Sequence, residues 1–157
     1  MPVIKLQTHI NADRQVVFDL ARSIDLHQIS TKHTNEKAVA GRCSGLIELN
    51  ETVTWQARHF GITQELTSKI TEFDNGVYFV DEMTKGIFKS IRHEHHFDKE
   101  DNGTLMTDIF SYVSPLGILG KMADGIFLSN YLKDLLIKRN DIIKEYAESN
   151  LLPIDHL

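Results

Sequence analysis

GILGKMADGIFLSNYLKDLLIKRNDIIKEYAES, residues 117–149, decides the fold of this chain, because its pattern is that of one long helix near the C-terminus. The segment contains no proline, and its apolar residues recur every three or four positions, as on one face of an α-helix. At about 100° per residue they form two stripes on roughly opposite sides. The earlier stripe contains Leu119, Met122, Ala123, Ile126 and Phe127. The later stripe contains Leu128, Leu132, Leu135, Leu136, Ile142, Ile143 and Tyr146. One straight helix cannot bury both stripes against one sheet, so we predict a bend near Asp124-Gly125 and a main helix from about Phe127.

The residues before this helix indicate one strand, two short helices and then a run of strands. Residues 2–10 alternate as a strand, Asn11 or Asp13 is placed to cap a short helix that reaches Leu20, and a second helical piece covers residues 24–29. Turn signals such as Asp-Asn-Gly separate the later strands. These strands are expected at residues 51–60, 62–73, 77–83, 89–98 and 104–114. The order predicts an α+β domain in which a curved antiparallel sheet wraps around the long C-terminal helix, with two short helices after the first strand.

Composition and charge exclude several classes of protein. The chain has 157 residues, with 17 Lys and Arg against 22 Asp and Glu, and no basic block is interleaved with aromatic residues, so nucleic acid is not an expected partner. There is no signal peptide pattern and no run of about 18 apolar residues, so we expect no membrane insertion. Cys43 is the single cysteine, which suits a reducing compartment. The expected location is therefore the cytoplasm, and the oligomeric state is left open.

Four motifs carry a resemblance to a known superfamily. They are TWQARHFG at 54–61, FVDEMTKGIF at 79–88, HEHHF at 93–97 and SPLGILG at 114–120. With the order of elements, they resemble the START-like, helix-grip (SRPBCC) superfamily, which contains the birch-pollen allergen, polyketide cyclases and lipid-transfer domains. The chain is most similar to small bacterial members described as ligand-binding or cell-division-inhibitor-like. The resemblance covers residues 1–150 as a single domain and leaves 151–157 as a tail. It implies a deep cavity between the concave sheet and the long helix.

The alternation of side chains predicts which residues face that cavity. In RHEHHF, residues 92–97, His93 and His95 share a face with Phe97 and the preceding Ile91, so both imidazoles are expected to point inward. The same parity selects Trp55 and Gln64 in earlier strands. In two strands either face is possible, and the look of similar family sequences favours the faces that carry an aspartate. The expected ligand-binding set is Trp55, Gln64, Phe79, Asp81, His93, His95, Phe97, Asp108, Phe110 and Tyr112 from the sheet, with Leu132 and Arg139 from the helix.

Three interpretations of the polar members of this set remain. His93 and His95 are spaced to hold a metal, with Asp81 or Asp108 as a third ligand, but no sequence feature fixes that ligand. A histidine beside an aspartate also serves as a general base in cyclase, dehydrase or isomerase chemistry. The favoured interpretation is a polar wall around a small apolar ligand such as a lipid, isoprenoid or aromatic polyketide, with no catalytic residue, metal or cofactor. A regulator that acts through protein contacts is a further alternative.

Arg139 falls in the centre of the later helical stripe. A buried charge needs a partner or an escape to water. The sequence therefore predicts either a bridge to Asp81 or Asp108, or an arginine at the cavity mouth whose head reaches solvent.

Overall fold

The computed structural model describes residues 1–114 and 124–150, which form a single antiparallel sheet and a set of helices packed against it. In chain order the elements are β1 (Val3–Ile10), α1 (Arg14–Ala21), α2 (Ile24–Ser30), η1 (Lys32–Thr34), β2 (Lys37–Gly41), β3 (Thr52–His59), β4 (Ile62–Asp74), β5 (Tyr78–Lys85), β6 (Ser90–Glu100), β7 (Gly103–Val113), η2 (Asp124–Leu128) and α4 (Ser129–Glu148). This order confirms the α+β class predicted from the sequence.

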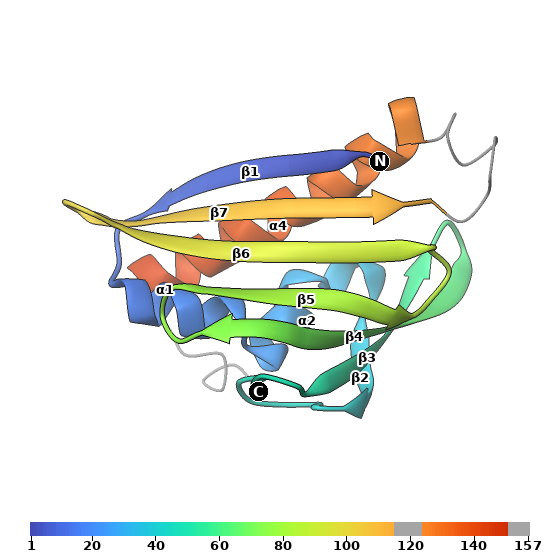
Figure 1. Cartoon of the computed structure of the whole chain (residues 1–157), viewed down its shortest axis with the longest axis horizontal. Coiled ribbons are helices and arrows are strands. Elements are labelled where there is room, and N and C mark those ends of the chain that lie inside the picture. The colour runs from blue at the N-terminus through green and yellow to red at the C-terminus, as the bar shows by residue number, and fades with distance from the viewer. Residues whose placement is uncertain (115–123, 151–157) are drawn as a thin grey trace.

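The sheet has seven strands in the order β1-β7-β6-β5-β4-β3-β2, and every neighbouring pair is antiparallel. β1 and β7, the first and last strands along the chain, therefore pair with each other at one edge of the sheet. β3 and β2 form the other edge. Figure 1 shows α1, α2 and α4 on the same side of this curved sheet, with α4 running along β1, β7 and β6. The long helix thus lies against the concave face, as predicted.

Local chemistry explains where the two short helices begin. The side chain of Asp13 accepts a hydrogen bond of 2.9 Å from the backbone N–H of Gln15, and Ser23 accepts one of 3.1 Å from Leu26. Each cap satisfies a backbone donor that the first helical turn leaves unpaired. Of the two caps considered for α1, the structure has Asp13.

The core forms between the sheet and the helices. Phe18 of α1 is fully buried, and its ring meets the rings of Phe73, Phe79 and Phe97 edge to face at 5.2–5.6 Å between centroids. Aromatic pairs prefer this geometry because the positive edge of one ring faces the negative face of the other. The first short helix is therefore anchored over the central strands β4, β5 and β6.

The later stripe of the long helix faces the sheet, as its periodicity predicted. Leu136, Ile143 and Tyr146 are buried, whereas Leu132 and Leu135 are half-buried. A π-helical turn, η2, precedes α4 at the position where a bend was expected. Of the earlier stripe, Leu119, Met122 and Ala123 lie outside the described residues, and Phe127 is 60% exposed.

One strand was missed. The five strands predicted after the short helices correspond to β3–β7, but β2 (Lys37–Gly41) was not among them. It is short, largely exposed and pairs only with β3, with a register shift between Ala38 and Ala40, so it has no regular alternation to recognise. Among the described residues, no helix combines the length and apolarity needed to cross a membrane.

Candidate functional site

A cavity of about 250 Å³ lies between the sheet and the helices. Its wall includes residues of α2, α4 and strands β3–β7, so it occupies the space that the curvature of the sheet opens in front of the long helix. The wall is mainly apolar, with Val53, Trp55, Leu66, Phe79, Phe110 and Leu132 among its members. Polar groups are concentrated in two places on it.

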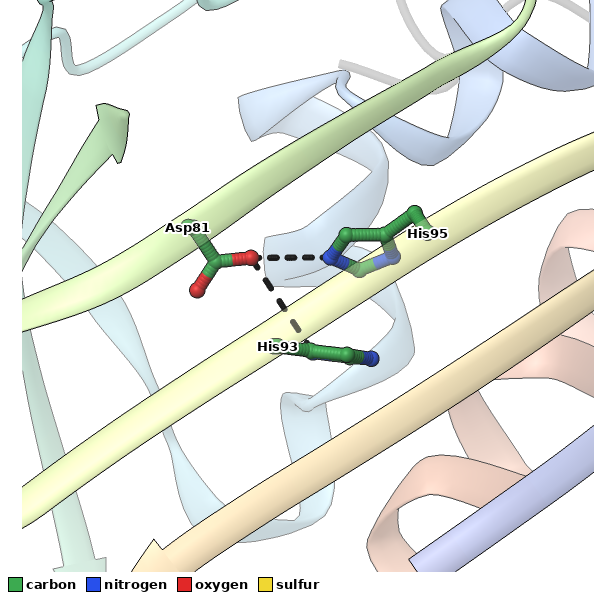
Figure 2. A group of neighbouring side chains, drawn as sticks. All are labelled: Asp81, His93 and His95. Carbon is green, nitrogen blue, oxygen red and sulfur yellow. Dashed lines mark hydrogen bonds and ion pairs between the residues drawn. The ribbon is translucent and has the colours of Figure 1, made fainter. Parts of the chain in front are cut away.

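The first cluster of polar side chains comes from three adjacent strands, β5, β6 and β7. Strand pairing sets Asp81 of β5 opposite His93 of β6, and His95 of β6 opposite Asp108 of β7. His95 Nε2 lies 2.8 Å from Asp81 Oδ2, and His93 Nδ1 lies 4.0 Å from the same oxygen, as Figure 2 shows. The two imidazole rings are stacked at a tilt with their centroids 3.7 Å apart. The pair therefore presents two nitrogen atoms to one carboxylate.

Asp108 contacts the other nitrogen of each ring, the one that does not face Asp81. Its Oδ1 lies 2.9 Å from His93 Nε2 and 3.1 Å from His95 Nδ1, and its side chain has no solvent exposure. Burial would raise the pKa of Asp108, but hydrogen bonds from the two histidines and the charge of Arg139 outweigh it and hold that pKa well below its ordinary value. Asp108 is thus an ionised group behind the cavity wall.

Arg139 reaches Asp108 from the helix. The residue is 6% exposed; Nη1 lies 3.4 Å from Asp108 Oδ1, and Nη2 donates to the carbonyl of Ala21 at 3.1 Å. Nη1 also donates to Asn140 Oδ1 at 3.0 Å, and Asn140 Nδ2 donates to Asp108 Oδ2 at 2.7 Å. Of the two arrangements considered, the structure has the buried bridge, with Asp108 as the carboxylate.

Burial also acts on the other members of the group. It lowers the pKa of His93 to about 4, helped by His95 and opposed by Asp108, so His93 is neutral at pH 7. Burial would raise the pKa of Asp81, but the hydrogen bond from His95 and the nearby charges lower it below its ordinary value. Two ionised carboxylates therefore flank a neutral imidazole.

The second polar group lies on the wall beside Trp55. His27 Nε2 of α2 is 2.7 Å from Glu36 Oε1, and its ring lies against the Trp55 indole at 4.2 Å between centroids, tilted by 37°. His59 Nδ1 lies 2.7 Å from the hydroxyl of Tyr131 on α4. Alternation along residues 51–60 puts His59 on the same face as Trp55. The sequence gave no signal for His27 and Glu36, because one is on a short helix and the other lies between elements.

Most of the residues expected to face the cavity do reach it. Its wall contains Trp55, Phe79, Asp81, His93, His95, Phe110, Leu132 and Arg139. Gln64 instead lines a smaller cavity of about 110 Å³, shared with Trp55 and His59. Parity therefore identified the inward face in three strands, and in β5 and β7, where parity left either face possible, the resemblance to the family selected it. Ile62, at the outer end of the face that carries Gln64, is 61% exposed.

Phe97, Tyr112 and Asp108 need correction, because they face inward without lining the cavity. Phe97 is covered by the Phe18 ring at 5.2 Å, and Tyr112 is fully buried in a cluster with Leu136. Alternation gives the face of a strand, but it does not say which part of that face the helices cover. The sequence also missed Asn140, although it lies four residues after Leu136 and three before Ile143 and so shares their helical face.

Solved structures share this architecture. TTHA0849 from Thermus thermophilus has a TM-score of 0.70 at 18% identity over 90% of this chain and 97% of its own. Ginseng major latex-like protein 151 from Panax ginseng has a TM-score of 0.69 at 19% identity, over 93% of this chain and 97% of its own. The di-domain ARO/CYC StfQ from the steffimycin biosynthetic pathway has a TM-score of 0.74 at 11% identity, over 94% of this chain and 51% of its own. No model of a known protein family and no curated protein matches the sequence.

Proposed function

We propose that this chain, which has the helix-grip fold of the START-like superfamily, binds a small and largely apolar molecule in its internal cavity. The observation that carries the proposal is the cavity itself: about 250 Å³, with a mainly apolar wall. An engineered cavity of about 150 Å³ with apolar walls is large enough to take up benzene. A ligand of one or two rings, or a short branched chain, matches the larger volume.

The polar groups on the wall define the rest of the ligand. Asp81 and His95 meet the cavity on one part of its wall, and His27 and Glu36 meet it on another. Pockets for small molecules combine apolar walls with a few polar atoms that fix orientation. The ligand that fits is therefore an apolar body with a hydrogen-bonding substituent, such as a phenol or an alcohol, and not a simple hydrocarbon.

Native mass spectrometry of the purified protein, followed by extraction and identification of any bound molecule, tests this proposal. Displacement of an apolar fluorescent dye by phenols and terpenoid alcohols gives a second measure. The variant Ser68→Phe fills the cavity, because Ser68 is 6% exposed and lines its wall. We expect this variant to lose binding at least tenfold, and its control Thr63→Phe, on an exposed position of the same strand, to keep it. Equal binding by both variants, or no binding by the parent chain, would contradict the proposal.

Catalysis is a second candidate, favoured by one specific observation. The His93 imidazole on the cavity wall is held by Asp108 at Nε2, 2.9 Å away, while its Nδ1 is 4.0 Å from Asp81, which is the arrangement of an oriented general base. The two candidates differ in the fate of the ligand. A bound molecule recovered with unchanged covalent structure after prolonged incubation supports binding alone, whereas a product that the parent forms and His93→Gln does not form supports catalysis.

A further inference from the structure

We propose that Asp81, His93 and His95 form a site for one divalent transition-metal ion, with a free coordination position that faces the cavity. From the sequence we expected no metal, because no feature fixed a third ligand beside the two histidines. The pairing of β5 with β6 places Asp81 in that position. This inference stands independently of the apolar ligand, since the metal alone is the probe that tests it.

The positions of the three ligand atoms are the first argument. One ligand atom from each of Asp81, His93 and His95 lies within 4.8 Å of the other two. Asp81 Oδ2 is 2.8 Å from His95 Nε2 and 4.0 Å from His93 Nδ1. Zn–N and Zn–O bonds of about 2.0–2.2 Å place neighbouring ligands of a tetrahedral site roughly 3.3–3.6 Å apart. The observed pair of distances brackets that value. Figure 2 shows both rings converging on the same oxygen of Asp81.

The second argument is the position of Asp108 behind the rings. A histidine that ligates a metal donates its other N–H to a carboxylate or carbonyl, which fixes its tautomer. Asp108 Oδ1 lies 2.9 Å from His93 Nε2 and 3.1 Å from His95 Nδ1. One carboxylate therefore lies within reach of the far nitrogen of each ring. In this structure His95 Nε2–H donates to Asp81, and metal binding uses the other tautomer of His95, with the proton on Nδ1 facing Asp108 and the Nε2 lone pair on the metal.

Arg139 and Asn140 complete this outer layer. Asn140 Nδ2 donates to Asp108 Oδ2 at 2.7 Å. Oδ2 therefore contacts the helix, while Oδ1 contacts the two histidines. Arg139 Nη2 is 3.4 Å from His95 Nδ1, which is farther than Asp108 Oδ1 at 3.1 Å. The guanidinium thus faces the unprotonated Nδ1 here, and the carboxylate is near enough to accept from Nδ1 once that nitrogen carries the proton.

Charge is the third argument. Asp81, whose side chain is 23% exposed, and the fully buried Asp108 are two carboxylates in one cluster. Within residues 1–114 and 124–150, Arg139 is the one arginine or lysine that forms an ion pair with either. An uncompensated buried charge is costly. A divalent cation bound between Asp81 and the two histidines supplies the missing positive charge at the point where the rings meet.

The donor set identifies the class of metal. Two imidazole nitrogens and one carboxylate oxygen suit zinc and the neighbouring divalent metals, whereas magnesium and calcium prefer oxygen ligands alone. Three protein ligands are also the number found in zinc sites that keep a position for water or substrate. All three residues line the cavity, so that position opens toward the bound molecule.

A metal titration of the full chain tests the proposal. After chelator treatment and dialysis, cobalt(II) is added and its visible absorption is recorded, followed by competition with zinc. We expect saturation at one equivalent, displacement by zinc, a rise in melting temperature with zinc, and none of these effects with magnesium. Failure of the parent chain to bind cobalt or zinc at one equivalent would overturn the proposal without any variant.

Variants then locate the site. His95→Gln and Asp81→Asn should each weaken zinc binding by at least tenfold, and Asp108→Asn, which does not touch the metal, by about 10- to 100-fold. The matched control is His96→Gln, because His96 is on the same strand as His95 but points to the opposite face, where it pairs with Glu94. If His96→Gln weakens binding as much as His95→Gln, the metal lies elsewhere and the proposal is wrong.

Discussion

Asn140 of α4 donates a hydrogen bond of 2.7 Å to Asp108 of β7, and this contact ties the long helix to a fully buried carboxylate on the sheet. Arg139, its neighbour in sequence, approaches the other oxygen of the same carboxylate at 3.4 Å. Two consecutive helical residues thus bind one acid. Because the acid also orients both histidines, the packing of the helix and the geometry of the site depend on each other.

Replacement of Arg139 by methionine should be strongly destabilising. The substitution keeps an apolar stem but leaves Asp108 without its cation, and loss of one partner of a buried pair costs about 3–5 kcal/mol. Addition of Asp108→Asn to Arg139→Met should recover part of the loss, since it removes the stranded charge. Urea denaturation measures both free energies of unfolding. The control is Lys138→Met on the exposed side of the same turn, and an Arg139→Met variant no less stable than this control would refute the bridge.

Replacement of Asn140 by alanine should cost about 1–3 kcal/mol, because it removes the 2.7 Å hydrogen bond to Oδ2 of the buried Asp108 carboxylate, whose other contacts are to Oδ1. Asn140 also donates to Thr8 Oγ1, but at 3.3 Å and to a neutral group. Thr8→Val should therefore cost less than Asn140→Ala in the same denaturation measurement. The reverse order would mean that the contact with β1, and not the one with Asp108, is what Asn140 contributes.

Much of the fold could be predicted because its signals are periodic. The stripe that contains Leu136 and Ile143 repeats at helical spacing and is buried as predicted, and the alternation around His93 and His95 placed both imidazoles on the inner face. The short strand β2 could not be recognised in the same way, because it is exposed and irregular.

The site was less predictable than the fold, because its contacts join distant segments. Nothing in the sequence states that Asp81 lies beside His95 or that Asp108 lies behind it; strand register decides both. Phe97 could not be separated from true wall residues for a related reason, since the position of α1 over the sheet covers it. The periodicity of a sequence predicts which face of a strand or helix is buried. Which side chains from different elements meet in a site depends on how those elements pair and pack.

Truncation of the helical stripe should have graded effects. Leu136 is 8% exposed in a packed cluster, so Leu136→Ala should lose about 2–5 kcal/mol of unfolding free energy. Leu132 and Leu135 are half-buried against the open cavity, so their alanine variants should lose less. Ile137→Ala, on the exposed face, is the control. Equal losses for Leu136→Ala and Ile137→Ala would show that the buried face has been assigned wrongly.

Glu36 should give stability that depends on pH. Burial would raise the pKa of Glu36, but the charge and hydrogen bond of His27, with smaller effects from His59 and His33, outweigh it and lower that pKa. These three histidines and the Tyr131 hydroxyl are the titratable groups that face it. A carboxylate with a lowered folded-state pKa contributes stability above its unfolded pKa of about 4.3 and loses it as the pH falls through the folded value.

The variant Glu36→Gln should therefore be less stable than the parent chain at pH 7, because it removes the ionised partner of His27. The difference should begin to shrink below about pH 5 and should vanish once the pH is below the folded pKa, where the parent carboxyl is protonated as well. Urea denaturation at pH 7, 5, 4 and 3 measures this difference. Glu145→Gln, on the exposed face of α4, should show almost none at any pH. A Glu36→Gln deficit that stays constant from pH 7 to pH 3 would mean that the variant loses packing and not charge, and the His27–Glu36 pair would then have no part in stability.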